Sequence, residues 1–416
     1  MASVDISVTS PSVSGSQQRH PVAFSVMTTV FFMWGFITCL NDILIPHLKG
    51  SFDLSYTQAM LIQFCFFGAY FICSVPAGKL LHRVGYKRGV MIGLCIAGVG
   101  ALMFYPAAEF QTYGIFLAAL FVLASGITLL QVAANPYVVA LGPAATGSSR
   151  LNLAQAFNSL GTTIAPIIGG ALIFGGIDAA TSAADAESVK IPYVGLAIAL
   201  VAIALILGFI KMPTLRDDQE SDQAGVKLSE ALSHRHLFYG VIAIFVYVGG
   251  EVSIGSFLVN FLAEPDVAGL TEASAANYVA LYWGGAMVGR FVGSVLMTRI
   301  APGLLLSAHS VLAVLLVATA TTSSGTLAMY AILAVGLCNS IMFPTIFSLS
   351  LHGLGRATSA GSAALCLAIV GGALVPLLQG VVADTAGLRT AFIVPALCYV
   401  YIAWFGAKGS QPQGAR

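Results

Sequence analysis

The stretch that decides the fold class is Phe31-Phe32-Met33-Trp34-Gly35-Phe36-Ile37-Thr38-Cys39-Leu40-Asn41-Asp42-Ile43-Leu44-Ile45-Pro46. It belongs to an apolar run long enough to cross a bilayer, for which about 20 residues are needed. Asp42 places a carboxylate inside that run. An unpaired charge at the bilayer centre costs from about 2.5 to well over 10 kcal/mol, so such an acid is by default a functional-site hypothesis.

The composition of the whole chain agrees with this beginning. Of 416 residues, 58% are hydrophobic and only 8% are charged, whereas about a quarter are charged in an ordinary soluble domain. The net charge of +1 provides no basic surface for nucleic acid. The seven cysteines lie in apolar runs without metal-ligand spacing, so we expect small buried hydrophobes and no metal site. No cleaved signal peptide is expected before Pro21.

The apolar runs predict an all-α integral membrane protein with twelve transmembrane helices. The expected spans are 22–46, 58–81, 87–106, 113–140, 151–174, 191–212, 236–262, 274–298, 303–321, 326–351, 358–383 and 388–406. Outside the spans, nearly all Lys and Arg residues fall on one side of the membrane, and the exceptions are Lys49, Lys190 and Arg389. The positive-inside rule therefore predicts that both termini are cytoplasmic.

An internal repeat divides the helices into two six-helix, pseudo-symmetric halves. Pro136 and Pro344 occupy similar places in equivalent helices, as do Pro166 and Pro376, and each pair lies roughly half the chain length apart. A polar linker separates the halves. The expected organisation is an N-terminal cytoplasmic tail at 1–20, a first half at 21–212, a cytoplasmic linker at 213–236, a second half at 237–406 and a cytoplasmic tail at 407–416.

Two neighbouring spans carry polar side chains at helical spacing. The fourth presents Thr128, Gln131 and Asn135 on one face, above Pro136. The fifth carries a longer stripe formed by Asn152, Gln155, Asn158, Ser159 and Thr162. One interpretation is that the two helices hydrogen-bond to each other, which is a common structural device. The many donors and acceptors in the fifth span favour instead the hydroxyl groups of a sugar.

A second intramembrane acid, Glu251, lies near the centre of the seventh span, among Gly249, Gly250 and Gly255. It has two interpretations. Glu251 is either a structural partner of Arg290 in the eighth span or a functional group. We expect Arg290 close to the cytoplasmic end, where its head can snorkel or join a gate, and this favours the functional interpretation.

The connection between the second and third spans is short and cationic, and we expect it to act, with Arg290, in a cytoplasmic gate. Its residues of interest are Gly78, Arg83, Gly85, Lys87 and Arg88. The chain has no P-loop for ATP, no HExxH metal helix and no G-x-S-x-G nucleophile elbow. A primary pump or a membrane hydrolase is therefore not expected, and we predict that the protein is not an enzyme.

This loop resembles the G-x-x-x-D-R-x-G-R-R pattern of the major facilitator superfamily, with His82 where the acid usually stands. More specific segments resemble the fucose and hexose symporter family within it, in particular its bacterial glucose/galactose branch. These segments are Leu40–Pro46, Ala133–Tyr137, Arg150–Ser159 and Phe343–Leu349. The resemblance covers nearly the whole chain.

The resemblance implies a rocker-switch carrier that moves a monosaccharide inward with a cation. Asp42 matches the first-helix acid of the fucose-proton members, and Gln155 and Asn158 match their sugar contacts. Gln131 stands where those members carry a second glutamate, and an amide cannot exchange a proton. The combination of Gln131 with Glu251 is similar to the glucose/galactose branch.

The sequence therefore predicts a monomeric hexose symporter of a bacterial inner membrane, surrounded by lipid, without a cofactor or nucleic-acid partner. Asp42 or Glu251 would carry the coupling H⁺ or Na⁺, since carboxylate and amide oxygens also suit a hard cation. The alternatives are a fucose or N-acetylglucosamine symporter, and a membrane sugar sensor that does not transport. The candidate sugar-binding residues are Trp34, Asn41, Gln63, Gln131, Asn135, Gln155, Asn158 and Asn339.

Overall fold

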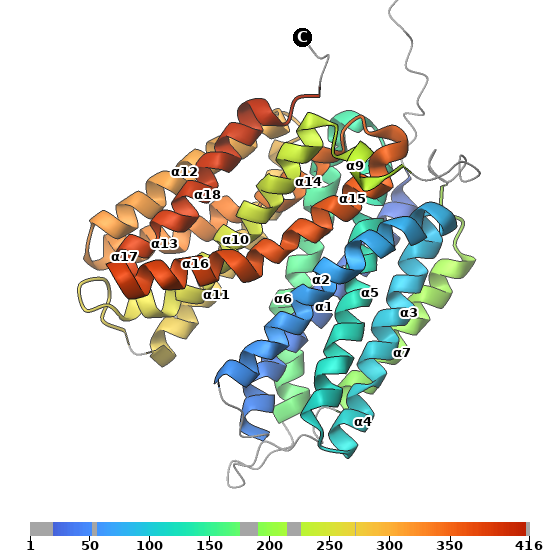
Figure 1. Cartoon of the computed structure of the whole chain (residues 1–416), viewed down its shortest axis with the longest axis horizontal. Coiled ribbons are helices and arrows are strands. Elements are labelled where there is room, and N and C mark those ends of the chain that lie inside the picture. The colour runs from blue at the N-terminus through green and yellow to red at the C-terminus, as the bar shows by residue number, and fades with distance from the viewer. Residues whose placement is uncertain (1–19, 52–55, 175–189, 214–225, 271, 413–416) are drawn as a thin grey trace, which may run out of the picture.

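The computed structural model describes residues 20–51, 56–174, 190–213, 226–270 and 272–412. Only the helical backbone is described for 39–51, 56–63, 166–174, 272–274, 276 and 277. Within the described residues the chain is helical, and the helices form two bundles that lie side by side (Figure 1).

The first bundle contains the helices before the linker. They are α1 (Pro21–Ser51), α2 (Tyr56–Val84), α3 (Tyr86–Leu102) continued by α4 (Phe104–Glu109), α5 (Tyr113–Ala140), α6 (Gly147–Phe174) and α7 (Lys190–Phe209). A single residue, Gly85, connects α2 to α3, and its φ of 80° belongs to the left-handed region that glycine adopts without strain. Part of the linker lies outside the described residues, and the described part contains the short helix α9 (Leu228–Ala231).

The second bundle begins at Arg235. Its helices are α10 (Arg235–Ala263), α11 (Glu272–Leu296), α12 (Pro302–Thr322), α13 (Gly325–Asn339) continued by α14 (Met342–Leu351), α15 (Thr358–Leu367) continued through η4 (Ala368–Val370) by α16 (Gly371–Ala386), α17 (Leu388–Ala391) and α18 (Ile393–Trp404), which ends in η5 (Phe405–Gly409). A further 3-10 turn, η3 (Gly355–Ala357), precedes α15.

The prediction of twelve spans is confirmed. In the described part of the chain, eleven segments are long and apolar enough to cross a membrane, and α6, with 28 residues, completes the set. Four spans expected to be continuous, at 87–106, 326–351, 358–383 and 388–406, are each built from consecutive helical pieces.

Pro136 and Pro344, which match each other in the repeat, each leave one backbone carbonyl without its helical donor. Proline has no amide hydrogen, so it cannot donate to the carbonyl four residues before it. For Pro136 that carbonyl belongs to Val132, and Ser362 of α15 donates to it at 2.7 Å. For Pro344 it belongs to Ser340, at the break between α13 and α14, and the Arg290 Nε donates to it at 3.1 Å. The matched prolines therefore create acceptors for contacts between helices.

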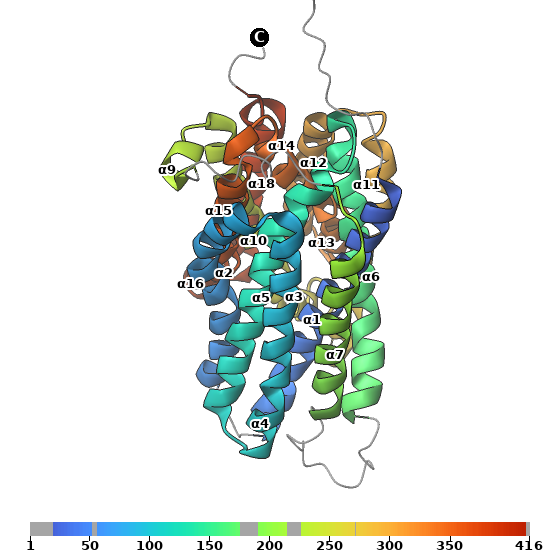
Figure 2. The same cartoon turned by 90° about the vertical axis from the view of Figure 1, so that its right-hand side faces the viewer.

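The two bundles meet along two seams near one end of the molecule, which we call the terminal end because η5 and α9 lie there (Figure 2). At the first seam α15 packs on α2, and the Ser359 hydroxyl donates to the Gly78 carbonyl at 2.8 Å. At the second seam α6 packs on α11 and α14. There the Ser148 and Ser348 hydroxyls lie 2.7 Å apart, and Ser149 donates to the Ser294 carbonyl at 2.6 Å.

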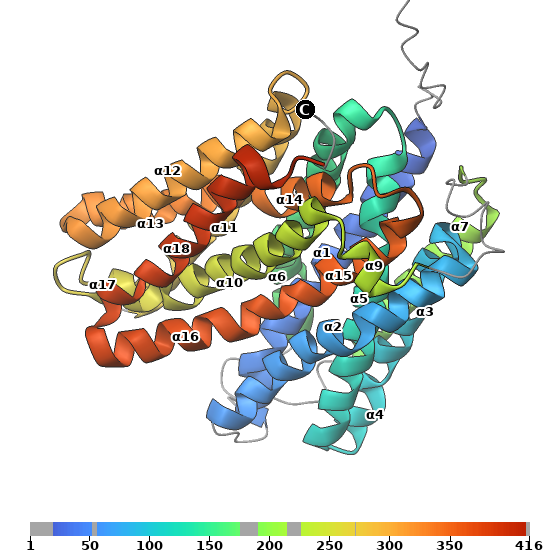
Figure 3. The same cartoon turned by 45° about the horizontal axis from the view of Figure 1, so that its top comes forward.

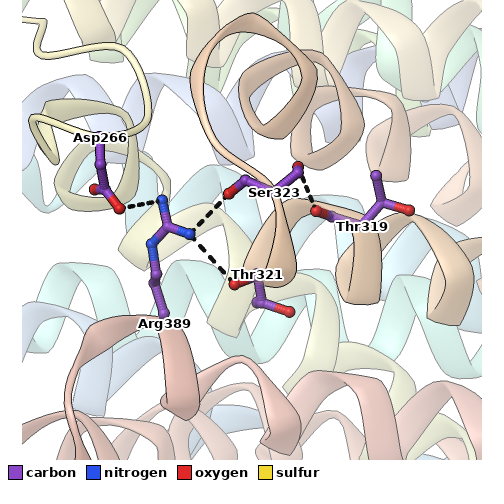
Figure 4. A network of polar contacts seen from close by, with 5 residues as sticks. All are labelled: Asp266, Thr319, Thr321, Ser323 and Arg389. Atoms are coloured by element: carbon purple, nitrogen blue, oxygen red, sulfur yellow. Dashed lines mark hydrogen bonds and ion pairs between the residues drawn. The ribbon is translucent and has the colours of Figure 1, made fainter.

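Away from the terminal end, the axes of the two bundles diverge (Figure 3). At that opposite end, Arg389 ties together three connections of the second bundle (Figure 4). Its guanidinium pairs with Asp266 at 2.8 Å and donates to the carbonyl oxygens of Ser323 and Thr321. These contacts lie within the second bundle, so they hold its loops without joining it to the first.

Inside the first bundle, α1 and α6 pack closely because glycines face each other across the contact. A Cβ added to Gly161 would overlap the Phe32 carbonyl oxygen, and one added to Gly35 would overlap the Asn158 carbonyl oxygen. Small residues of this kind let membrane helices approach until their backbones touch. The close approach fixes the polar stripe of α6 against α1.

Candidate functional site

The polar face of α5 is buried, and several amide atoms of its side chains have no hydrogen-bond partner. The Gln131 Nε2 donates to the Tyr70 hydroxyl of α2 at 2.6 Å, and its Oε1 is buried without a partner. Both amide atoms of Asn135 are buried and unpaired. Thr128 bonds to the Ala124 carbonyl of its own helix. The described contacts therefore leave Gln131 and Asn135 with capacity to bind a ligand or water.

The stripe on α6 is divided between structural and unpaired groups. The Asn158 Nδ2 donates to the Phe31 carbonyl at 2.9 Å and so fastens α6 to α1. Trp34, also on α1, is buried with its ring 5.3 Å from that of Phe31. Gln155 is buried, and its Nε2 has no partner. No hydrogen bond between the α5 and α6 amides occurs among the described contacts, so the ladder between them that was one interpretation is not formed there.

A second polar cluster lies in the other bundle, around Glu251 on α10. The Glu251 Oε1 is buried without a hydrogen-bond partner, and the carboxylate interacts with the Tyr247 hydroxyl one turn before it. Tyr247 also donates to the Asn339 carbonyl at 3.1 Å, and the Asn339 Nδ2 donates to the Tyr282 hydroxyl at 2.7 Å. The Asn339 Oδ1 remains unpaired. Tyr399 on α18 adds a buried hydroxyl that interacts with Asn339 in this cluster.

Arg290 connects the two clusters. No ion pair joins it to Glu251 among the described contacts, although the two charges interact electrostatically. Its guanidinium donates instead to the Ser340 carbonyl of its own bundle and to the Ser159 hydroxyl on α6. Ser159 in turn donates to the Gln155 carbonyl at 3.2 Å. A polar path therefore runs from Gln155, across the seam between the bundles, to Glu251.

Three predicted residues cannot be placed at side-chain level. Asn41 and Asp42 lie on α1 and Gln63 lies on α2, and their side chains are outside the described residues. Asp42 is two helical turns beyond Gly35, the point at which α1 touches α6.

The residues of the predicted gating loop all belong to the first bundle, but their contacts differ. The Lys87 Nζ donates to the carbonyls of Gly208 and Ile210, at 3.0 and 2.9 Å, so it caps the end of α7 within the first bundle. Gly78 accepts the bond from Ser359 across the seam. Arg83 and Arg88 are exposed, and Gly85 forms the turn.

The site contains groups that sequence reasoning did not select. Tyr70 and Tyr282 each hold an amide of the site, and they resemble ordinary packing aromatics in the sequence. Ser362 is a further group of this kind, and the carbonyl that Pro136 leaves without a helical donor is the sequence signal that such a residue must exist. In the described part of the chain, no three His, Cys, Asp or Glu side chains gather as metal ligands.

The unpaired amide and hydroxyl groups of this arrangement can donate to and accept from a hydroxyl-rich molecule. Amide, hydroxyl and carboxylate atoms from both bundles are buried and unpaired, and each costs free energy until a partner is supplied. They lie on helices that belong to different bundles, which meet at the terminal end through α15 with α2 and through α6 with α11 and α14.

Comparison with known proteins identifies the architecture. The family model described as Major Facilitator Superfamily matches residues 23–372. The chain belongs to the major facilitator superfamily. This chain is 56% identical to the glucose/galactose transporter of Brucella abortus (strain 9-941). The identity extends over 398 residues, which is 96% of each chain. It is 36% identical over 418 residues to the L-fucose-proton symporter of Escherichia coli K12, covering 96% of this chain and 95% of that one.

A solved structure supports the same assignment. The major facilitator superfamily transporter FucP, in its outward conformation, superposes with a TM-score of 0.86 at 35% identity, covering 94% of this chain and 99% of that one. The resemblance inferred from the loop and helix motifs is thereby confirmed, and the relatives are transporters rather than enzymes.

Proposed function

We propose that this protein imports a hexose of the glucose or galactose type by symport with a cation. The observation that carries the proposal is the pair of buried polar clusters, around Gln131 and Asn135 in one bundle and around Glu251 and Asn339 in the other. Sugar hydroxyls both donate and accept, so one hexose can satisfy unpaired amides on both sides. Support for the substrate class comes from the relative named as a glucose/galactose transporter.

The proposed cycle is alternating access by rocking of the two bundles around the site. The bundles contact each other at the terminal end and diverge at the other (Figure 1). We assign the terminal end to the cytoplasm of a bacterium, because Arg83, Lys87, Arg88, Lys227 and Arg356 gather there. With that assignment the structure corresponds to an outward-facing state in the inner membrane, with both termini cytoplasmic and the protein acting as a monomer in lipid.

Arg290 provides a physical link between the coupling charge and the seam. Its guanidinium attracts the Glu251 carboxylate and also holds Ser159 of the other bundle. When a proton or Na⁺ neutralises Glu251, the attraction between Glu251 and Arg290 is lost. The balance between the contacts of Arg290 then changes, and with it the equilibrium between the two carrier states. Asp42 is the second candidate for the coupling group, and proton coupling is the named property of the fucose relative.

The test is uptake into proteoliposomes under an imposed proton gradient and then an imposed sodium gradient. The sugars are glucose, galactose, fucose and N-acetylglucosamine. We expect glucose or galactose to accumulate under one gradient only. Labelled-sugar counterflow separates a carrier from a non-transporting sensor, because a sensor gives none. Absence of counterflow with all four sugars would refute the proposal.

Two variants test the coupling assignment. We expect Glu251→Gln or Asp42→Asn to abolish accumulation while counterflow continues, because exchange of bound sugar does not require the ion to move. The control is Glu230→Gln, since Glu230 is an exposed acid on α9, outside the spans. If both coupling variants accumulate sugar as the control does, the assignment of the coupling charge is wrong.

A further inference from the structure

The hydroxyl of Tyr247 has one hydrogen and two acceptors within reach. It donates to the backbone carbonyl of Asn339 at 3.1 Å. It also interacts with the carboxylate of Glu251, which lies one turn further along α10. Tyr247 and Asn339 are both fully buried, so bulk water does not reach the contact between them. A phenol has a single donor, and the hydroxyl can therefore serve only one of the two acceptors at a time.

The Asn339 carbonyl lies at the break in the span that α13 and α14 form. Asn339 is the last residue of α13, and α14 begins at Met342. The next carbonyl, that of Ser340, accepts from the Arg290 Nε at 3.1 Å, and Arg290 also interacts with Glu251. Two successive carbonyls at the break are therefore bonded by donors from α10 and α11, and both donors interact with the same carboxylate.

Helix α14, which follows the break, reaches the second seam between the bundles. Its Ser348 hydroxyl lies 2.7 Å from that of Ser148 on α6. The Asn152 amide of α6 donates to its Thr345 hydroxyl at 3.3 Å. Helix α10 packs along α14. A change in hydrogen bonding at the break therefore acts on the helix that holds the two bundles together at this seam.

The charge of Glu251 decides which acceptor holds the Tyr247 hydrogen. A hydrogen bond to an ionised acceptor is roughly twice as strong as one to a neutral acceptor, so the charged carboxylate competes with the Asn339 carbonyl. A protonated carboxyl is itself a donor. It can donate to the Tyr247 oxygen, and the Tyr247 hydrogen is then left to the Asn339 carbonyl. The other titratable groups that interact with Glu251 from neighbouring helices are Arg290, Tyr282 and Tyr399.

We propose that Tyr247 is a positioning residue for ion coupling, which bonds the Glu251 carboxylate when Glu251 is charged and the Asn339 carbonyl when Glu251 is protonated. The proton that Glu251 takes up thereby changes the hydrogen bonding at the break between α13 and α14. This inference rests on the proposed function in that Glu251 takes the coupling ion, and it requires a proton, because Na⁺ has no hydrogen to donate to the Tyr247 oxygen.

The first test observes the proton itself and does not require transport. The infrared difference spectrum of the purified full-length protein between acid and neutral pH contains the C=O stretch of each carboxyl that gains a proton. The band that is missing in Glu251→Gln belongs to Glu251. In Tyr247→Phe this band should remain and shift in frequency, because the protonated carboxyl loses its hydrogen-bond partner. The aromatic ring, which packs 6.3 Å from that of Phe343, is retained in this variant.

A matched control removes a similar hydroxyl elsewhere in the same bundle. The Tyr401 hydroxyl of α18 donates to the Tyr239 carbonyl of α10, also at 3.1 Å. Tyr401→Phe therefore removes a bond of the same kind and length without touching the surroundings of Glu251. We expect the Glu251 band to keep its frequency in this control.

The second test is a double-mutant cycle read by hydrogen–deuterium exchange at the break. The amide of Glu251→Gln can donate to the Tyr247 oxygen as a protonated carboxyl does. The Tyr247 hydrogen then stays with the Asn339 carbonyl, and one hydrogen bond is worth about 0.5–1.5 kcal/mol. Relative to its effect in the Tyr247→Phe background, Glu251→Gln should therefore slow exchange across 339–345 by about 2- to 13-fold. Any effect that passes through Arg290 is common to both backgrounds and cancels.

Three results would overturn the proposal. They are absence of the Glu251 band in the wild type, an unchanged frequency in Tyr247→Phe, and an equal effect of Glu251→Gln on exchange in the two backgrounds. The proposed function can fail separately. If the band shifts and the two backgrounds differ, but no sugar undergoes counterflow, the role of Tyr247 stands and the assignment of hexose transport is wrong.

Discussion

Ser362→Ala is the most informative single change at the seam between the bundles. Ser362 donates at 2.7 Å to the Val132 carbonyl, and Pro136 cannot supply the helical amide that this carbonyl would otherwise accept. Both Val132 and Ser362 are fully buried. In the closed seam, removal of the hydroxyl therefore leaves a buried carbonyl unpaired, whereas in a state with the seam open water can bond to it.

The magnitude follows from that asymmetry. An unpaired buried acceptor costs about 1–3 kcal/mol, which shifts the equilibrium toward the open seam by about 5- to 150-fold. Ser359→Ala is a matched comparison on the same helix. The Gly78 carbonyl that Ser359 bonds lies within α2, where the amide four residues on supplies a helical bond. Only the net value of one bond is lost there, about 0.5–1.5 kcal/mol, so the shift should be smaller.

The assay is hydrogen–deuterium exchange mass spectrometry of unlabelled protein in nanodiscs. When exchange occurs through opening of the seam, the exchange rate of α15 amides rises by the same factor as the opening equilibrium. We expect Ser362→Ala to exceed Ser359→Ala. Ser310→Ala should leave the rate unchanged, because the buried Ser310 hydroxyl bonds to the Leu306 carbonyl of its own helix.

A double-mutant cycle makes the reasoning refutable. Pro136→Ala restores an amide that can donate to the Val132 carbonyl, so Ser362→Ala should cost less in that background, with a coupling energy of about 1 kcal/mol or more. Equal effects of Ser362→Ala in the two backgrounds would show that the proline-freed carbonyl is not the reason for the bond.

Three further changes test the packing and the loops. Gly161→Ala should destabilise the protein by about 1–3 kcal/mol, because the added Cβ forces α6 away from α1. The measurement is thermal stability, and the control is Gly195→Ala, where an added Cβ meets nothing within 4 Å. Lys87→Met should cost about 1–2 kcal/mol because two carbonyls at the end of α7 lose a charged donor, and stability equal to the wild type would contradict the capping role. Arg389→Met should destabilise the protein more than Asp266→Asn in the same assay. The Asp266 side chain is 57% exposed and its ion pair is worth about 0–1 kcal/mol, whereas Arg389 also donates to two carbonyls. The reverse order of stabilities would refute this.

Several features of this protein follow directly from the sequence. Twelve apolar segments predict twelve spans because each span must satisfy its own backbone bonds in lipid. Glu251 was identifiable for the same reason, since a charge in such a segment is expensive, and the structure leaves its Oε1 buried and without a hydrogen-bond partner. The repeat of Pro136 and Pro344 was also visible, as was the stripe of amides on α6.

The partners of these groups required the tertiary structure. Gln131 bonds to Tyr70, and Asn158 bonds to the Phe31 carbonyl rather than lying free for a ligand. Arg290 was expected near a gate or paired with Glu251, and the structure places its donors on the Ser340 carbonyl and on Ser159 of the other bundle. Pro344 marks the Ser340 carbonyl as an acceptor, but the sequence does not identify its donor or the partners in the other pairings, because each depends on how far a helix is rotated about its axis.

There is a physical reason why the sequence predicts the spans and not the contacts between them. The bilayer acts on each helix separately, so hydropathy and charge along one segment are enough to predict a span, its direction and the cost of an acid within it. Contacts between helices are set instead by shape and by which polar groups the neighbouring helix presents. Those neighbours come from both halves of the chain. The sequence alone therefore determined the membrane fold and the acids that lie within its spans, and only the tertiary structure decided that Arg290 and Ser362 join the bundles and that Tyr247 and Arg290 bond successive carbonyls at the break between α13 and α14.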